Sequence, residues 1–204
     1  MTVKSNIVTL ATIASEVQTV TVDATGGTFT ITFPASGLAH SGGTTAALAF
    51  DVSAEDATTA CEAVVGADNI VVTGGPGDSG GTQPYTLTYA GDLAYTNVSQ
   101  VTTTATSLTG GAGTATPATT TAGVARVRLD TAAHTDGKDG SCVYLRNTGA
   151  QTAYIGGPDV TTSNGYPLAA TTTMQWELDL ADGEALYGCT STSTTTVAVL
   201  ETGA

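Results

Sequence analysis

Acidic residues at short spacing are the first feature of this sequence that can support chemistry. Asp136 and Asp139 lie close together, with Asn147 further along the chain, and oxygen donors of this kind bind Ca²⁺. The Asp-Gly-Lys-Asp-Gly segment lacks the alternating ladder and terminal glutamate of an EF-hand, so we expect a solvated turn. Glu177 and Asp179 alternate along one predicted strand, which favours a solvent-exposed face over an acid–base pair.

A glycine-rich loop carries the next candidate, a nucleophilic serine. Gly77-Asp78-Ser79-Gly80-Gly81 matches the segment around the nucleophile of chymotrypsin-like serine proteases, and Thr131-Ala132-Ala133-His134 resembles the segment around their catalytic histidine. In that family the histidine precedes the serine, whereas here His134 follows Ser79. The other histidine, His40, has a different sequence context. We therefore expect a strand connection at Ser79, no catalytic residues and no enzyme.

The cysteines and histidines do not predict a metal or cofactor site. Cys61, Cys142 and Cys189 have no paired spacing, and no Cys/His cluster has the spacing of a zinc site. We expect all three cysteines to be reduced, with Cys61 on the apolar face of a helix. Cys142 and Cys189 fall in predicted strands of the second module, and their spacing leaves open whether they are neighbours.

Aromatic residues offer a possible carbohydrate platform. Tyr85 and Tyr89 have strand spacing and share a face, with Tyr95 further along. Packing within the protein is the more common outcome for such a face, so we expect Tyr85 and Tyr89 to pack in the core. Trp176 is predicted to anchor the core of the second module, with its indole N–H bonded to an acceptor.

Charge and composition exclude whole classes of function. The 204 residues include 18 acidic and 5 basic side chains, for a net charge of -13, and 43 are threonine. Duplex binding depends on Lys and Arg contacts to phosphates, so no nucleic-acid partner is expected. The apolar runs are too short to span a bilayer, and the first residues have no pattern of a secretory signal, so no membrane partner is expected.

Hydrophobic periodicity predicts a mainly β fold with two modules. In the first, Val17–Val22 and Thr28–Phe33 alternate as strands around a predicted hairpin loop. Residues 53–66 are predicted as the one short helix, with Ser53 as N-cap and Gly66 after its end. The second module has six short strand candidates and predicts an antiparallel sandwich or barrel.

The expected boundaries follow the change in charge balance and composition near residue 123. They divide the chain into an N-terminal arm over 1–15, a β-rich module over 16–109, a linker over 110–123 and a β-sandwich module over 124–204. The arm has apolar residues without a clear partner within the chain, so it is the candidate partner-binding segment. Its candidate residues are Val3, Ile7, Val8, Leu10 and Ile13.

Several segments resemble modules of virion structural proteins from tailed phages of actinobacteria. The resemblance covers most of the chain beyond residue 15, and its motifs recur in head decoration, fibre and tail proteins. The segments are Glu16–Val22, Gly26–Phe33, Val71–Gly77, Pro84–Ala94, Val143–Gly149, Ala153–Thr161 and Asn164–Leu168.

The resemblance implies a virion component without catalytic residues. Our leading expectation is a capsid decoration (head accessory) protein, made in the host cytoplasm and placed on the capsid exterior. Its expected partners are the major capsid protein and further copies of itself. The alternatives are a tail or fibre component that contacts the host surface, and a secreted carbohydrate-binding module.

Overall fold

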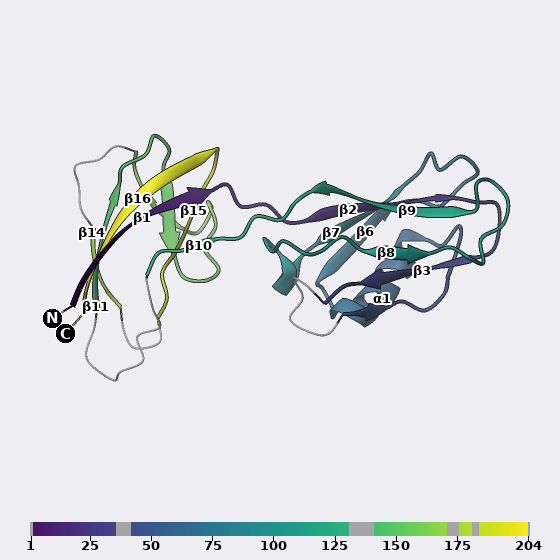
Figure 1. The fold of residues 1–204 in the computed structure, drawn as a ribbon, viewed down its shortest axis with the longest axis horizontal. Helices are drawn as coiled ribbons and strands as arrows, with labels where there is room; N and C mark the ends of the chain where they lie inside the picture. The colour runs from purple at the N-terminus through teal and green to yellow at the C-terminus, as the bar shows by residue number, and fades with distance from the viewer. Residues whose placement is uncertain (1, 36–41, 131–140, 171–175, 181–183, 204) are drawn as a thin grey trace. The chain divides into compact units, whose positions relative to one another are not determined.

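The chain is mainly β, as its periodicity predicts, and forms two compact units. The structure is a computed structural model that describes all residues except 1, 36–41, 131–140, 171–175, 181–183 and 204. Residues 14–125 form the central unit, and residues 1–13 together with 126–204 form the terminal unit (Figure 1). Each unit encloses its own hydrophobic core. Among the described residues, no helix has the length and apolar character needed to cross a membrane.

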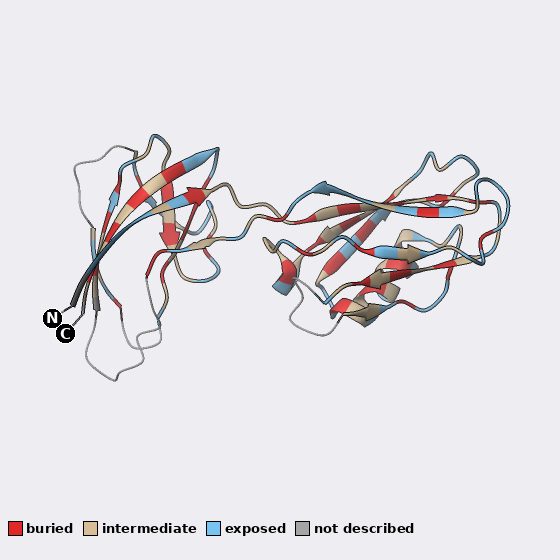
Figure 2. Ribbon diagram, in the orientation of Figure 1, coloured by how far each residue is buried: buried red, intermediate tan, exposed pale blue. Residues whose placement is uncertain are grey.

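The central unit packs two antiparallel sheets and a helix around one core. Buried residues alternate with half-buried ones along Val17–Asp23, Thr28–Phe33 and Tyr85–Tyr89, so each of these strands turns one face inward (Figure 2). The first sheet has the order β6-β7-β2-β9, with β2 Val17–Asp23, β6 Ile70–Gly74, β7 Tyr85–Tyr89 and β9 Thr114–Thr121. The second contains β3 Thr28–Phe33, β4 Gly43–Thr44, β5 Leu48–Ala49 and β8 Thr102–Thr104. A short 3₁₀ turn, η1, covers Gly91–Leu93.

The predicted helix is present as α1, Ala54–Val65. The Asp56 N–H donates to Ser53 Oγ at 3.1 Å, and the Ser53 hydroxyl donates back to Asp56 Oδ2 at 2.7 Å. This reciprocal cap satisfies one of the free amides at the helix start. Gly66 follows the helix with φ 96°, a backbone conformation that residues with a Cβ atom rarely adopt. Cys61 is fully buried on the inner face, as expected.

The predicted hairpin between β2 and β3 is wrong. β2 pairs with β7 and β9, whereas β3 pairs with β4, β5 and β8. The intervening residues cross from one sheet to the other, where Gly26 and Thr109 form an isolated bridge. Alternation predicts each strand but not its partners, because a strand of a sandwich core has the same pattern whichever neighbour it pairs with.

A buried polar network ties β2 to two neighbouring segments. Gln18 is fully buried; its amide donates to Glu16 Oε1 and to the Val98 carbonyl, and its Oε1 accepts the Val101 N–H at 2.9 Å. The other Glu16 oxygen accepts the Gly123 N–H at 2.8 Å. Buried polar groups with all partners present fix a strand's position, so this network holds residues without regular structure against the sheet.

The terminal unit is the predicted antiparallel sandwich. Its core is lined by apolar residues of both sheets. The first sheet, which we call the outer sheet, has the order β1-β16-β11-β14. Its strands are β1 Thr2–Ala11, β11 Ser141–Asn147, β14 Trp176–Leu180 and β16 Thr194–Gly203. The second sheet has the order β10-β15-β12-β13, with β10 Val127–Arg128, β12 Ala153–Gly156, β13 Tyr166–Leu168 and β15 Tyr187–Thr190.

The structure corrects two of the expected boundaries. The first residues are not an arm without an internal partner: β1 pairs along its whole length with β16, so the two ends of the chain lie side by side (Figure 1). The expected linker over 110–123 contains β9, which pairs with β2 from Thr114 to Thr121. The boundary expected at 123/124 lies close to the observed one, after Ala125.

Candidate functional site

The outward face of the outer sheet is the candidate site, and its strand register arranges the side chains in rows. Ile7 of β1, Ala198 of β16 and Arg146 of β11 lie opposite one another. The next row contains Ser5, Leu200, Tyr144 and Glu177. Because alternate residues of a strand share a face, these side chains all point away from the core.

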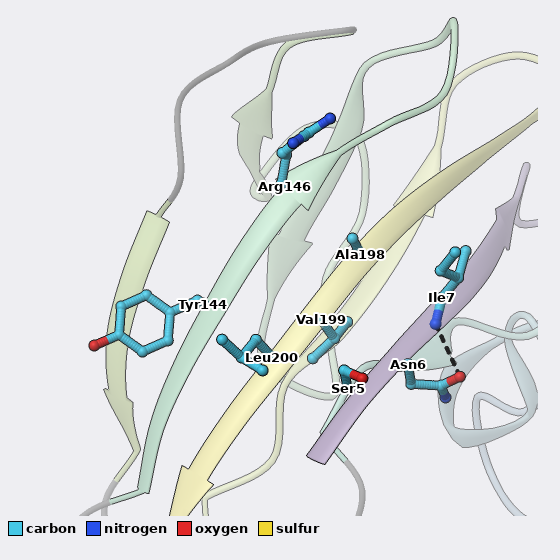
Figure 3. Close-up of a pocket in the computed structure, with 8 residues that line it drawn as sticks. All are labelled: Ser5, Asn6, Ile7, Tyr144, Arg146, Ala198, Val199 and Leu200. Carbon is cyan, nitrogen blue, oxygen red and sulfur yellow. Dashed lines mark hydrogen bonds between the residues drawn. The ribbon is translucent and has the colours of Figure 1, made fainter. Parts of the chain in front are cut away.

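A hollow of about 540 Å³ opens on this face (Figure 3). Its floor is low because Ala198 is small and stands between the larger Ile7 and Arg146 in the same row. Leu200 and Tyr144 continue the surface along the strands. We call this surface the contact face; its lining residues are Ser5, Asn6, Ile7, Tyr144, Arg146, Ala198, Val199 and Leu200.

Two side chains of the contact face, Ile7 and Arg146, are strongly exposed. Ile7 is 68% exposed, which is high for a large aliphatic side chain within a strand. Arg146 is exposed, and no described residue forms a hydrogen bond or ion pair with its guanidinium. By contrast, Arg128 is paired with the buried carboxylate of Asp130 at 2.5 Å. An aliphatic group beside an unpaired arginine is typical of surfaces that bind another protein.

A cluster of polar groups borders the contact face on β11 and β14. The Cys142 sulfur lies 3.0 Å from Glu177 Oε1 and 3.1 Å from Asp179 Oδ1, and the Tyr144 hydroxyl donates to Glu177 Oε1 at 3.1 Å. These hydrogen bonds to Glu177 and then to Asp179 raise the pKa of Cys142 to about 11. The bond to Cys142, followed by that to Glu177, raises the pKa of Tyr144 to about 12. Both groups therefore remain protonated donors near neutral pH.

The sequence predicts the exposure of these carboxylates but not the cluster. Glu177 and Asp179 both lie on an exposed strand face, as the alternation along β14 indicates. The pairing of β11 with β14 places them opposite Tyr144 and Cys142. This register joins residues far apart in the sequence, and no local signal reports it.

The serine loop joins β6 to β7 and is organised by Asp78. Asp78 Oδ1 accepts the Thr82 N–H at 2.7 Å, and its other oxygen accepts the Thr82 hydroxyl. The side-chain bond from Thr82, with the backbone bond beside it, lowers the pKa of Asp78. Ser79 is exposed. The loop around Ser79 is therefore a connection between two strands, as predicted. The two histidines considered with it, His40 and His134, lie outside the described residues.

The described part of the calcium candidate has a structural role. Asn147 is fully buried; its amide donates to the carbonyls of Gln151 and Leu168, and its oxygen accepts the Gly149 N–H and the Thr195 hydroxyl. Asp136 and Asp139 lie outside the described residues. No group of three or more His, Cys, Asp or Glu side chains that could hold a metal occurs in the described part of the chain.

The tyrosines predicted to prefer the core are indeed buried. Tyr85 and Tyr89 are 2% and 1% exposed, so neither forms a sugar platform. The Tyr85 hydroxyl donates to the Val52 carbonyl at 2.7 Å, whereas that of Tyr89 has no partner among the described residues. Burial, followed by the charge of Glu16, raises the pKa of Tyr89. Exposed aromatic surface occurs instead at Tyr166, whose ring meets Trp176 edge-on at 4.0 Å.

The three cysteines are free thiols on separate elements. Cys142 points outward from β11, whereas Cys189 is buried in β15 of the other sheet. The two are therefore not paired.

Comparison with known proteins gives no family for this chain. No family model matches it, and no curated protein matches it significantly.

Proposed function

We propose that the chain is a structural component of a tailed-phage virion, and within it a capsid decoration protein on the outer surface of the major capsid protein lattice. The observation that carries this proposal is the contact face. Ile7 exposes aliphatic surface beside a hollow, and no described residue pairs with Arg146 at its edge. A structural protein acts through contacts between subunits, and this face has the composition of such a contact.

The resemblance to virion proteins supports the same proposal. Its segments include β2, β3 and β7 of the central unit and β11, β12 and β13 of the terminal unit. It therefore extends over both cores and is not confined to one short motif. The excess of acidic residues keeps free copies soluble before assembly.

Binding to capsids tests this function. The purified chain is mixed with expanded capsids of an actinobacterial tailed phage that encodes it, and the pellet is measured after ultracentrifugation. We expect saturable binding, which Ile7→Asp weakens about tenfold or more because a charge replaces exposed apolar surface at the contact face. Val71→Asp is the matched control, because Val71 is also an exposed strand residue, 47% accessible, but lies on β6 of the central unit.

Mass spectrometry of separated heads and tails decides between the two virion locations. Detection in heads together with capsid binding supports the decoration role. Detection in tails without capsid binding would favour the tail or fibre alternative.

A carbohydrate-binding module is the second candidate, favoured by the aromatic pair of Tyr166 and Trp176. Tyr166 is 62% exposed, and aromatic rings with a free face stack on sugars. Binding on a glycan array that is lost in Tyr166→Ala would favour this candidate over the virion role.

A further inference from the structure

The outward face of the outer sheet carries charges of both signs. Arg146 lies on β11, and Glu177 lies on β14 opposite Tyr144, the neighbour of Arg146 on the same face. Asp179 follows Glu177 one step along that face and lies opposite Cys142. The guanidinium has no partner among the described residues, so an unpaired cation and two carboxylates share one exposed surface.

The carboxylate of Glu177 is held in place for a further contact. Its Oε1 atom is bound by the Tyr144 hydroxyl and lies 3.0 Å from the Cys142 sulfur. Among the described residues, no donor binds Oε2, which remains free for a cation from outside the chain. A carboxylate fixed by its neighbours loses little freedom when it binds a guanidinium, and this favours binding.

We propose that a second copy of this chain docks on this face, with Arg146 of each copy bound to Glu177 of the other. Symmetric dimers need a self-complementary surface. This face meets that condition because Arg146 and its complement, Glu177, lie in adjacent rows of side chains. A two-fold axis lying between the two faces and passing over Tyr144 brings each arginine onto the opposite glutamate. The same axis brings Leu200 and Tyr144 of the two copies together at the centre.

Charge favours a second copy over an unrelated acidic partner. The complement that Arg146 needs is already present on the same face, oriented by Tyr144. The net charge of -13 makes two copies repel at long range, but at physiological salt this repulsion is screened beyond about 8 Å. Ion pairs enclosed by the contact are screened less, so they persist while the long-range term fades.

The dimer deepens the proposed function and rests on it for its role in assembly. The dimer and the capsid lattice would use the same face, so the dimer is the form of the free protein and gives way to the lattice contact on assembly. The dimer itself is measured with pure protein and no capsids. If no dimer forms but the chain still binds capsids, a second copy is the wrong occupant of this face and the proposed function stands. If the dimer forms but the chain does not bind capsids, the virion role is wrong.

Charge reversal tests the pairing of Arg146 with Glu177. Sedimentation equilibrium of the wild-type chain should show a concentration-dependent dimer. Arg146→Glu and Glu177→Arg, each alone, place like charges together at both pairs and should weaken dimerisation about tenfold or more. Mixing the two variants restores opposite charges at both pairs and should restore the dimer as a heterodimer.

The controls keep the result independent of misfolding. Val71→Glu places a new carboxylate at an exposed strand position on β6 of the central unit and should leave dimerisation unchanged. Recovery on mixing cannot arise from two unfolded chains. Two results would overturn the proposal. One is a wild-type chain that stays monomeric up to about 100 μM, near the affinity of weak specific contacts. The other is a loss of the dimer in the two variants that mixing them does not reverse.

Discussion

At the scale of single residues, the reactivity of Cys142 follows from its two carboxylate neighbours. Its pKa of about 11, against an ordinary value of 9.0, lowers the thiolate fraction about 100-fold at pH 8. We expect iodoacetamide to alkylate Cys142 correspondingly slowly, with a rate that rises about tenfold per pH unit until the pH approaches the pKa. Mass spectrometry of the folded protein over a pH series measures this rate.

A variant separates the electrostatic effect on Cys142 from its accessibility. Glu177→Gln combined with Asp179→Asn removes both charged acceptors and leaves the strand face of similar shape, so alkylation at pH 8 should accelerate. Cys61 and Cys189 are fully buried, and burial raises the pKa of both, so they should not react in the folded chain. If wild-type Cys142 reacts as fast as a model thiol, the hydrogen bonds to the carboxylates do not hold in solution.

At the scale of elements, patterns within one segment were predictable and pairings between segments were not. The α1 cap and apolar stripe, and the alternation of β7 from Tyr85 to Tyr89, are local signals that the structure confirms. The segment of β9 was predicted as part of a linker because residues 110–123 are Gly, Ala, Thr and Pro117, with too little apolar area to pack alone; the structure buries only Ala115 of the strand. Its extended form comes from pairing with β2, a contact between distant segments that its own composition does not indicate.

The candidate site shows the same limit. Ile7 was identified as a candidate from the apolar content of the first residues, and the structure places it on the contact face. Arg146 and Tyr144 join it only through β16, which pairs with both β1 and β11. Leu10 and Val8, selected by the same reasoning, face the core of their own unit instead.

The two sides of β1 predict opposite responses to truncation. Leu10 is fully buried and packs beside Gly188 of β15, so Leu10→Ala should lower the free energy of unfolding of the terminal unit by about 3 kcal/mol. Ile7→Ala removes a similar aliphatic side chain on the exposed side of the strand and should change it by less than about 0.5 kcal/mol. Thermal unfolding of dilute protein measures both; equal effects would contradict the placement of β1 in its own core.

At the scale of the whole molecule, the central unit is inserted between β1 and the remainder of the terminal unit. Its core draws on residues from Val20 to Ala115 alone. Its two ends are joined, because the Val124 N–H donates to the Ala14 carbonyl at 2.8 Å and the Ala14 N–H donates back at 3.2 Å. A unit with its own core and adjacent ends has what independent folding requires.

The two units should therefore respond differently when the chain is cut. Residues 14–125 alone should unfold cooperatively at the temperature of the matching transition in the full chain, because no core contact is lost. Residues 126–204 alone lack β1 and leave the β16 edge and the site of Leu10 open, so they should not fold stably. Adding a synthetic peptide of residues 1–13 should restore structure by supplying the missing strand, measured by circular dichroism. If residues 126–204 fold fully without the peptide, β1 is not needed for the stability of the terminal unit.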